Sequence, residues 1–350
     1  MEQSLGRRID QAIRGLAPGY FALVMATGIV SVAMHSNGLH LLSSALLVIA
    51  AVAYVLLIGL VLVRALRHRD ALKQDFADPA RAFGFFTFVA ATCVLGSRLG
   101  IENMYDLALP LLAVASLAWL LLGYVIPWTA VLGRTVRPVL QTANGTWFIW
   151  VVASQSIAVL AATLEVVLDQ HRRWLALMAV FSWSVGIFLY ASAGVFVSAR
   201  MLIYDLKPED LTPPYWVAMG ATAITVVAGA RIVGMAEAPM VDATRGLIAG
   251  ASVFFWAFGS WLIPPLVFAG YWRHFVHRIP LRYEAAHWSV VFPLGMYGVG
   301  AQFLGEADQL PLVKAIGFYE SWIALAAWTL VFGAMLWNLY RNVLRAPTSF

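Results

Sequence analysis

Long apolar stretches almost free of charge recur along the whole of this 350-residue chain. An α-helix needs about 20 such residues to cross a bilayer, and the segments Leu41 to Val63 and Trp174 to Ala199 contain no charged residue at all. Charged residues make up 12% of the chain, roughly half of their share in a soluble domain. We therefore predict an integral membrane protein whose solvent is the lipid bilayer.

The same stretches also restrict the fold class. In hydrocarbon every backbone polar group must be paired within the chain, which leaves helices and closed barrels as spanning structures. The stretches are too long for barrel strands and lack their alternation of apolar and polar residues. We predict one all-α membrane domain over 1–350 with ten transmembrane helices, at 17–36, 41–63, 82–101, 107–133, 143–165, 174–199, 214–236, 246–272, 287–305 and 316–340.

Basic residues lie mostly on one side of this topology. Ten spans place both termini on the same side, and most of the 23 Lys and Arg residues fall there. The positive-inside rule then predicts a multi-pass protein of the inner (plasma) membrane with both termini in the cytoplasm. This asymmetry explains the net charge of +5 without a nucleic-acid partner. The single Cys93 excludes an intrachain disulfide.

The spans also repeat in pairs. Odd-numbered spans begin near residues 17, 82, 143, 214 and 287, so that five helical hairpins follow one another. Odd spans are rich in Gly, Ser, Thr and Gln, whereas even spans are dominated by Leu, Val, Ala and Trp, as expected of helices that face lipid. We predict a quasi-five-fold arrangement in which five odd helices form an inner ring around a central pore and five even helices surround them.

Polar residues of the odd spans recur at spacings that share one helix face. We predict that this face lines the pore through Thr27, Ser31, Thr92, Asn144, Ser154, Gln155, Thr222, Thr225, Gly295 and Gln302. The alternative is that small and hydroxyl residues only let the helices pack closely. Gln155 and Gln302 favour a wet lumen, because a buried amide needs partners or water.

Two arginines occupy matching places in their repeats, near the ends of inner spans. An unpaired charge inside a membrane is costly unless it faces protein or water. Arg98 and Arg231 therefore either attract anions at a pore mouth or form structural salt bridges, to Glu102 and Glu237 or to an acid of another repeat, and the two roles can coexist. Arg231 lies deeper in its apolar segment and is the stronger functional candidate.

The ninth span contains the pair Phe292-Pro293. Proline inside a helix removes a backbone hydrogen bond and predicts a kink. A phenylalanine at such a kink, in a helix otherwise lined by glycines, would plug a narrow lumen as a hydrophobic gate. Packing is the more common role of an aromatic side chain in a membrane helix.

Three segments resemble motifs of the tellurite-resistance and C4-dicarboxylate transporter family, which includes plant slow anion channels, yeast malate permeases and yeast sulfite exporters. They are Pro18 to Ser31, Asn144 to Phe148 followed by Ser154 to Ser156, and Trp288 to Gly295. The likeness runs from the first span to the last. It implies ten helices in five hairpins around a largely uncharged pore, commonly three protomers with a pore each, and occlusion of the pore by a phenylalanine that matches Phe292.

Together, residues and resemblance predict transport of small anions such as chloride, nitrate, sulfite or malate through a pore closed by Phe292. The alternative is a proton-coupled C4-dicarboxylate carrier or a tellurite or sulfite exporter. A coupled carrier needs a titratable group in mid-membrane, and the inner spans offer little beyond His287 near one end. This mildly favours a channel mechanism.

An enzyme would need His, Asp, Glu or Cys clustered at one depth of the membrane. The seven His lie at span ends or in loops. We therefore expect no catalytic residues, no metal and no cofactor. The expected partners are small anions, the lipid bilayer and two further copies in a homotrimer. A purely structural role would predict no flux under any gradient.

Overall fold

The computed structural model describes residues 5–133, 137–235 and 238–345, and every secondary-structure element within these ranges is helical. This confirms the predicted all-α fold. Nine helical segments of the described chain are long and apolar enough to cross a membrane: Pro18–Ser36, His40–Arg67, Ala82–Ile101, Tyr105–Leu132, Gly145–Glu165, Asp169–Ile203, Pro213–Val233, Pro239–Val276 and Pro311–Leu344.

The predicted span at 287–305 coincides with α11 (Trp288–Ala307), which is not among these nine. α11 contains a proline, a glutamine and several glycines. The count of ten transmembrane helices therefore stays a prediction.

Five helices form an inner ring. Each packs against the next, and the last packs against the first, so that the ring closes through α2 (Ala22–Ser36), α5 (Phe86–Ile101), α7 (Phe148–Glu165), α9 (Val217–Val233) and α11. These are the odd-numbered spans of the sequence analysis.

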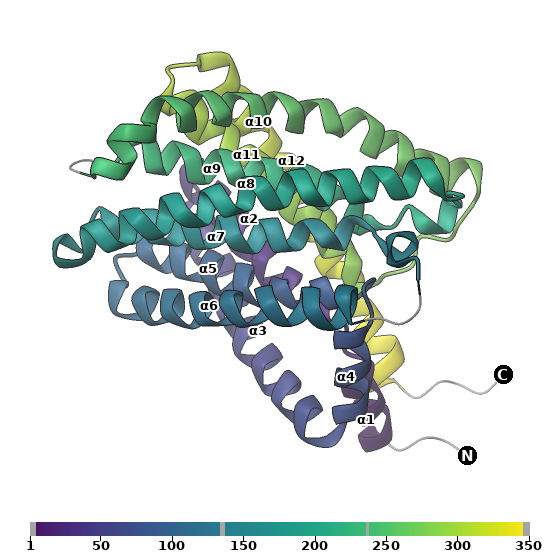
Figure 1. The fold of residues 1–350 in the computed structure, drawn as a ribbon. Helices are drawn as coiled ribbons and strands as arrows, with labels where there is room; N and C mark the ends of the chain where they lie inside the picture. Colours follow the sequence, from purple (N-terminus) through teal and green to yellow (C-terminus); the bar gives the residue numbers. More distant parts are fainter. Residues whose placement is uncertain (1–4, 134–136, 236–237, 346–350) are drawn as a thin grey trace.

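The remaining long helices pack outside this ring (Figure 1). Each lies against the inner helix that precedes it in the chain: α3 (His40–Arg67) on α2, α6 (Tyr105–Ile126) on α5, α8 (Arg172–Ile203) on α7, α10 (Pro239–Tyr271) on α9 and α12 (Pro311–Leu339) on α11. The chain thus forms two concentric layers, while the quasi-five-fold symmetry of the layers stays a prediction.

Burial separates the two layers clearly. In α2, α5, α7 and α9, together with the turns that precede them, 72–94% of the most apolar stretch is buried, compared with 11–39% in the five outer spans. A large exposed apolar surface marks a membrane-facing region. The outer helices expose many Leu, Phe and Trp side chains, as expected of helices that face lipid.

Each inner helix is preceded by a short 3₁₀ turn. The turns are η1 (Pro18–Phe21), η2 (Ala82–Phe85), η5 (Gly145–Trp147), η8 (Pro213–Trp216) and η10 (Ala285–His287), and they too contact one another in a closed ring. The five inner helices therefore start at the same end of the bundle and run parallel.

Glycines allow these turns to meet backbone to backbone. A Cβ added to Gly84 would lie 3.0 Å from the backbone nitrogen of Gly19. A Cβ added to Gly145 would overlap the carbonyl group of Pro214 in the next turn. The ring of turns is therefore tightly packed at this end.

Both ends of the described chain lie at the same end of the bundle (Figure 1). Helix α1 (Leu5–Arg14) packs beside η11 (Tyr340–Leu344), and Arg8 donates a hydrogen bond to the carbonyl oxygen of Arg345 at 2.6 Å. Because α1 leads directly into η1, the ring of turns lies at this end as well. We call this end the terminal side and the opposite end the far side.

Candidate functional site

A cavity of about 30 Å³ lies at the centre of the inner ring. All five inner helices contribute to its wall, with Ile29, Val32, Val94, Ser97, Ile101, Ser156, Val159, Ile224, Val227, Arg231, Met296, Val299 and Phe303. This volume has room for about one or two water molecules. The inner ring therefore surrounds a small space, while a continuous central pore stays a prediction.

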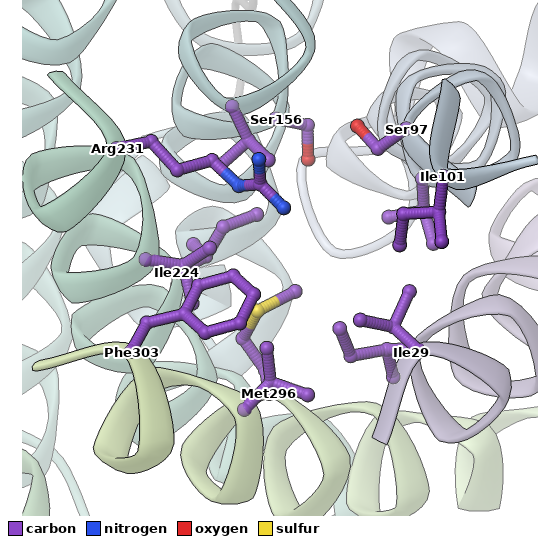
Figure 2. Close-up of a pocket in the computed structure, with 13 residues that line it drawn as sticks. Ile29, Ser97, Ile101, Ser156, Ile224, Arg231, Met296 and Phe303 are labelled. Atoms are coloured by element: carbon purple, nitrogen blue, oxygen red, sulfur yellow. The ribbon is translucent and has the colours of Figure 1, made fainter. Parts of the chain in front are cut away.

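Three polar side chains share one side of this cavity. Arg231 comes from α9, Ser156 from α7 and Ser97 from α5, and Figure 2 shows them along one wall, with Phe303 and Met296 on the opposite wall. The Nε of Arg231 and the hydroxyl oxygens of both serines are buried without a hydrogen-bond partner. Buried polar groups are normally paired, so this wall carries unused hydrogen-bonding capacity.

The guanidinium of Arg231 has an aromatic neighbour but no partner of opposite charge within the described ranges. Its central carbon lies 4.9 Å from the ring centroid of Phe303, a cation–π contact. Glu237, the salt-bridge partner considered from the sequence, lies outside the described residues. The charge of Arg231 is therefore directed into the cavity.

Arg98, the other arginine of the pair, is held differently. It is completely buried, and its Nε and Nη2 donate hydrogen bonds of 2.8 Å to the hydroxyls of Ser31 and Ser43. Its Nη2 also pairs with Oε1 of Glu102 at 2.7 Å. This hydrogen bond from Arg98 holds the pKa of Glu102 below its usual value. Arg98 thus joins α5 to α2 and α3, which is the structural role that the sequence left open.

None of the predicted lining residues lies along the cavity wall, and several lie between the layers. Three of their hydroxyls pair with aromatic side chains of outer helices. The pairs are Thr27 with Trp328 (2.9 Å), Thr92 with Tyr54 (2.9 Å) and Ser154 with Trp119 (2.8 Å). These contacts correspond to the close-packing alternative considered for such residues.

The two glutamines also bond to outer helices. Nε2 of Gln155 donates to the carbonyl of Trp183 on α8 at 3.1 Å. Nε2 of Gln302 donates to the hydroxyl of Ser321 on α12 at 2.9 Å. The NH2 groups of both amides therefore have protein partners, while Oε1 of Gln155 is buried without one in the described part of the chain.

The other predicted lining residues have similar local roles. Ser31 bonds to Ser43 and Arg98, Thr222 and Thr225 donate to carbonyls of their own helix, Gly295 packs against Ile29, and Asn144 caps η5 by accepting from the backbone N–H of Thr146. None of the ten predicted residues is among those that line the central cavity. Their part in permeation stays a prediction.

The residues that do line the cavity share a different face of each helix. On α11 they are Met296, Val299 and Phe303, and on α9 they are Ile224 and Val227 with Arg231. These spacings of three, four and seven follow one helix face. In the sequence, the position of Arg231 indicated this face, whereas the distribution of hydroxyl residues did not.

Phe292 lies on the same face of α11, four residues before Met296, and therefore towards the terminal side of the cavity. Only 1% of Phe292 is exposed. The adjoining Pro293 packs against α9, where a Cβ added to Gly220 would lie 2.8 Å from the proline ring. This position is compatible with a plug below the cavity, and the gating role of Phe292 and Pro293 stays a prediction.

The chain was also compared with known proteins. The family model described as SLAC1, voltage-dependent anion channel, matches residues 15–336. An uncharacterized membrane protein of Mycobacterium tuberculosis is 65% identical over 162 residues, which cover 46% of this chain and 82% of the relative.

Two more distant relatives match over nearly the full length. An uncharacterized transporter of Methanocaldococcus jannaschii is 23% identical over 91% of this chain and 92% of its own. The sulfite efflux pump SSU1 of Trichophyton rubrum is 21% identical over 93% of this chain and 92% of its own.

Proposed function

This chain belongs to the SLAC1 family of voltage-dependent anion channels, and from that premise we propose that small anions cross the membrane along the axis of its inner ring, past a gate at Phe292. The family and the relatives carry the names of channels, transporters and efflux pumps, so the protein is a membrane protein of anion transport. The anion, the pathway and the gate are our proposals.

One observation supports the pathway above all others. The guanidinium of Arg231, with no counter-charge among the described residues, faces a cavity lined by all five inner helices. A positive charge acts strongly in an apolar, water-poor space, because the effective dielectric constant there is far lower than in bulk water. An anion that enters the ring is therefore attracted to its centre.

The terminal side of the ring supports a gate. Phe292 is buried directly below the cavity wall, and the five 3₁₀ turns pack closely beneath it. A hydrophobic constriction blocks ions because water and ions do not wet it. We propose that the ring is closed at this level and that displacement of the Phe292 ring opens it.

A proton-coupled carrier of C4-dicarboxylates is the second candidate. Arg231 is the one ionisable side chain among the residues that line the cavity, and an arginine does not release its proton in proteins. A coupled mechanism would therefore need a proton site elsewhere in the chain, and we favour the uncoupled channel.

We also propose the cellular arrangement. The terminal side faces the cytoplasm of a cell whose inner (plasma) membrane holds the protein, because basic residues concentrate on that side. We propose a homotrimer with one pathway in each protomer, as the sequence resemblance implies.

Anion flux in proteoliposomes tests this function. Wild type and Phe292→Ala are compared for chloride, nitrate, sulfite and malate, with and without a pH gradient. Phe86→Ala is the matched control, because Phe86 is also fully buried on an inner helix but its ring stacks on that of Trp150, with 5.6 Å between the ring centroids. We expect Phe292→Ala to raise flux by at least about tenfold, independently of the pH gradient, which corresponds to about 1.4 kcal/mol of barrier.

Phe86→Ala should leave flux close to the wild-type rate. If wild type moves malate only with a proton gradient and Phe292→Ala abolishes that movement, the channel proposal is wrong and the coupled carrier replaces it.

A further inference from the structure

We propose that Arg231, Ser97 and Ser156 form a binding site for one singly charged small anion, so that the ring selects such anions over dicarboxylates. The inference rests on the proposed function, because it assumes that anions enter the ring. It goes further by naming the residues that hold the anion and the charge that the site accepts.

The cavity wall contains hydrogen-bond donors that have no partner among the described residues. Three buried polar atoms without a partner, Nε of Arg231 and the hydroxyl oxygens of Ser97 and Ser156, belong to residues that line the same cavity. They come from three different helices, and Figure 2 shows the side chains along one wall. A guanidinium only donates, and a serine hydroxyl has a proton to donate. The ligand that satisfies all three is therefore an acceptor.

The same wall also carries the positive charge of Arg231. Arg231 is the one charged residue among those that line the cavity, and no carboxylate from the described ranges faces it. A bound anion therefore balances a charge that has no counter-charge among the described residues. An uncharged acceptor such as water would satisfy the hydrogen bonds but would leave this charge uncompensated.

The opposite wall of the cavity limits the ligand to one negative charge. It consists of apolar side chains, among them Ile29, Met296 and Phe303. A second carboxylate would lie against these side chains without a donor, and an unpaired buried charge is strongly unfavourable. The cavity of about 30 Å³ also leaves little space for water to shield it.

The shape of the donors favours particular anions. A guanidinium presents planar, parallel N–H groups that match flat oxyanions in a bidentate manner. Nitrate has this shape and a single charge, and a halide needs only converging donors. For sulfite, the site favours the form that carries one proton and therefore one charge.

This arrangement departs from what the sequence resemblance implied. A largely uncharged pore would attract anions only weakly. A resident arginine at the centre of the ring instead gives the pathway a saturable site, at which an anion pauses before it passes Phe292.

Calorimetric titration of the detergent-solubilised protein tests the site directly. Nitrate, chloride and malate are titrated into wild type, Arg231→Met, Arg231→Lys, Ser97→Ala and Ser156→Ala. Ser182→Ala is the matched control, because the Ser182 hydroxyl is equally buried but donates to its own helix at the carbonyl of Met178, at 2.7 Å.

We expect Arg231→Met to weaken nitrate binding by at least about tenfold, Arg231→Lys to restore part of the affinity, and each cavity serine variant to weaken it by about threefold. Ser182→Ala should bind as wild type does. Malate should bind wild type at least about tenfold more weakly than nitrate. Equal nitrate binding by wild type and Arg231→Met, or malate binding as tight as nitrate, would overturn the inference.

Parallel flux measurements separate this inference from the proposed function. If nitrate and malate cross wild-type vesicles equally well and Arg231 variants bind nitrate normally, the site is wrong although transport stands. If nitrate binds at Arg231 but no anion crosses even in Phe292→Ala, the site stands and the transport proposal is wrong.

Discussion

The two halves of the inner ring are built from the same five helices but are packed in opposite ways. On the terminal side the 3₁₀ turns meet backbone to backbone, and Phe292 is buried near the start of α11. Towards the far side the same helices leave a cavity with Arg231 in its wall. Glycine and proline permit the close packing of the first half, whereas branched apolar side chains and one arginine hold the second half apart.

The two inner arginines show the same contrast at the level of single residues. Arg98 donates to two hydroxyls and a carboxylate, so its charge is compensated by protein, although its Nη1 is also buried without a partner within the described ranges. Arg231 contacts the ring of Phe303 and leaves Nε unpaired. A charge that protein compensates stabilises the fold, whereas an uncompensated charge is available to a ligand.

The largest effect should come from breaking the packed half. In Gly145→Ala the added Cβ overlaps the Pro214 carbonyl, so one of the 3₁₀ turns must move. We expect the free energy of unfolding in detergent micelles to fall by about 3 kcal/mol. Gly250→Ala is the control, because no heavy atom lies within 4 Å of its added Cβ. Equal free energies of unfolding for the two variants would show that the turns can move apart without loss of stability.

Arg98→Met should have the next largest effect, on stability and not on anion binding. It removes the hydrogen bonds to Ser31, Ser43 and Glu102, and we expect the free energy of unfolding to fall by about 2 kcal/mol. The side chain of Glu102 is 39% exposed, so solvent screens part of the ion pair. Nitrate affinity should match wild type, and loss of that affinity would contradict the division of roles between the arginines.

The same pair predicts a dependence on pH. The folded-state pKa of Glu102 is lowered by Arg98, so the carboxylate stabilises the fold above its unfolded pKa. This contribution is lost as the pH falls through the lowered folded pKa. When the free energy of unfolding is measured at decreasing pH, its difference between wild type and Arg98→Met should become smaller below the folded-state pKa of Glu102. A constant difference would mean that the ion pair contributes nothing measurable.

Arg231→Met should behave differently from Arg98→Met. Because Arg231 has no counter-charge among the described residues, its replacement by an apolar side chain of similar length removes a desolvation penalty. We expect unfolding stability to stay the same or to rise by about 1 kcal/mol. A loss as large as that of Arg98→Met would show that Arg231 is a structural residue.

The smallest loss of stability should come from the contacts between the layers. In Thr27→Val the Nε1–H of Trp328 loses its acceptor, and we expect a loss of about 1 kcal/mol with flux within about twofold of wild type. Thr329→Val is the control, because Thr329 is exposed and donates to its own helix. A large change of flux in Thr27→Val would support the predicted pore-lining role of Thr27.

The sequence predicted the fold better than it predicted the site. Apolar length and the contrast between odd and even spans were sufficient for an all-α protein with inner and outer helices. The choice of pore-lining residues was based on polarity. That criterion selected Thr27, Gln155 and Gln302, whose polar groups bond to outer helices. A buried hydroxyl satisfied by a neighbouring helix has the same sequence pattern as one that faces a lumen.

Ser97 and Ser156 show why the remaining part of the site was not predictable. Ser97 is not among the predicted lining residues, and Ser156 enters the sequence analysis only as the end of a segment that resembles a family motif. Their relevance depends on the rotation of α5 and α7 about their axes, which places both hydroxyls on the cavity wall. Helix rotation is set by packing against neighbours, and single-sequence periodicity does not resolve it when every face is apolar.

The most direct test of the contrast between the two halves is nitrate flux through Phe292→Ala and through the double variant Phe292→Ala/Arg231→Met in the same vesicles. With the gate removed, the arginine should govern the passage of anions. We expect the double variant to carry nitrate at least about tenfold more slowly than Phe292→Ala when nitrate is dilute. Equal nitrate flux in both variants would contradict the account, because Arg231 would then have no part in the pathway.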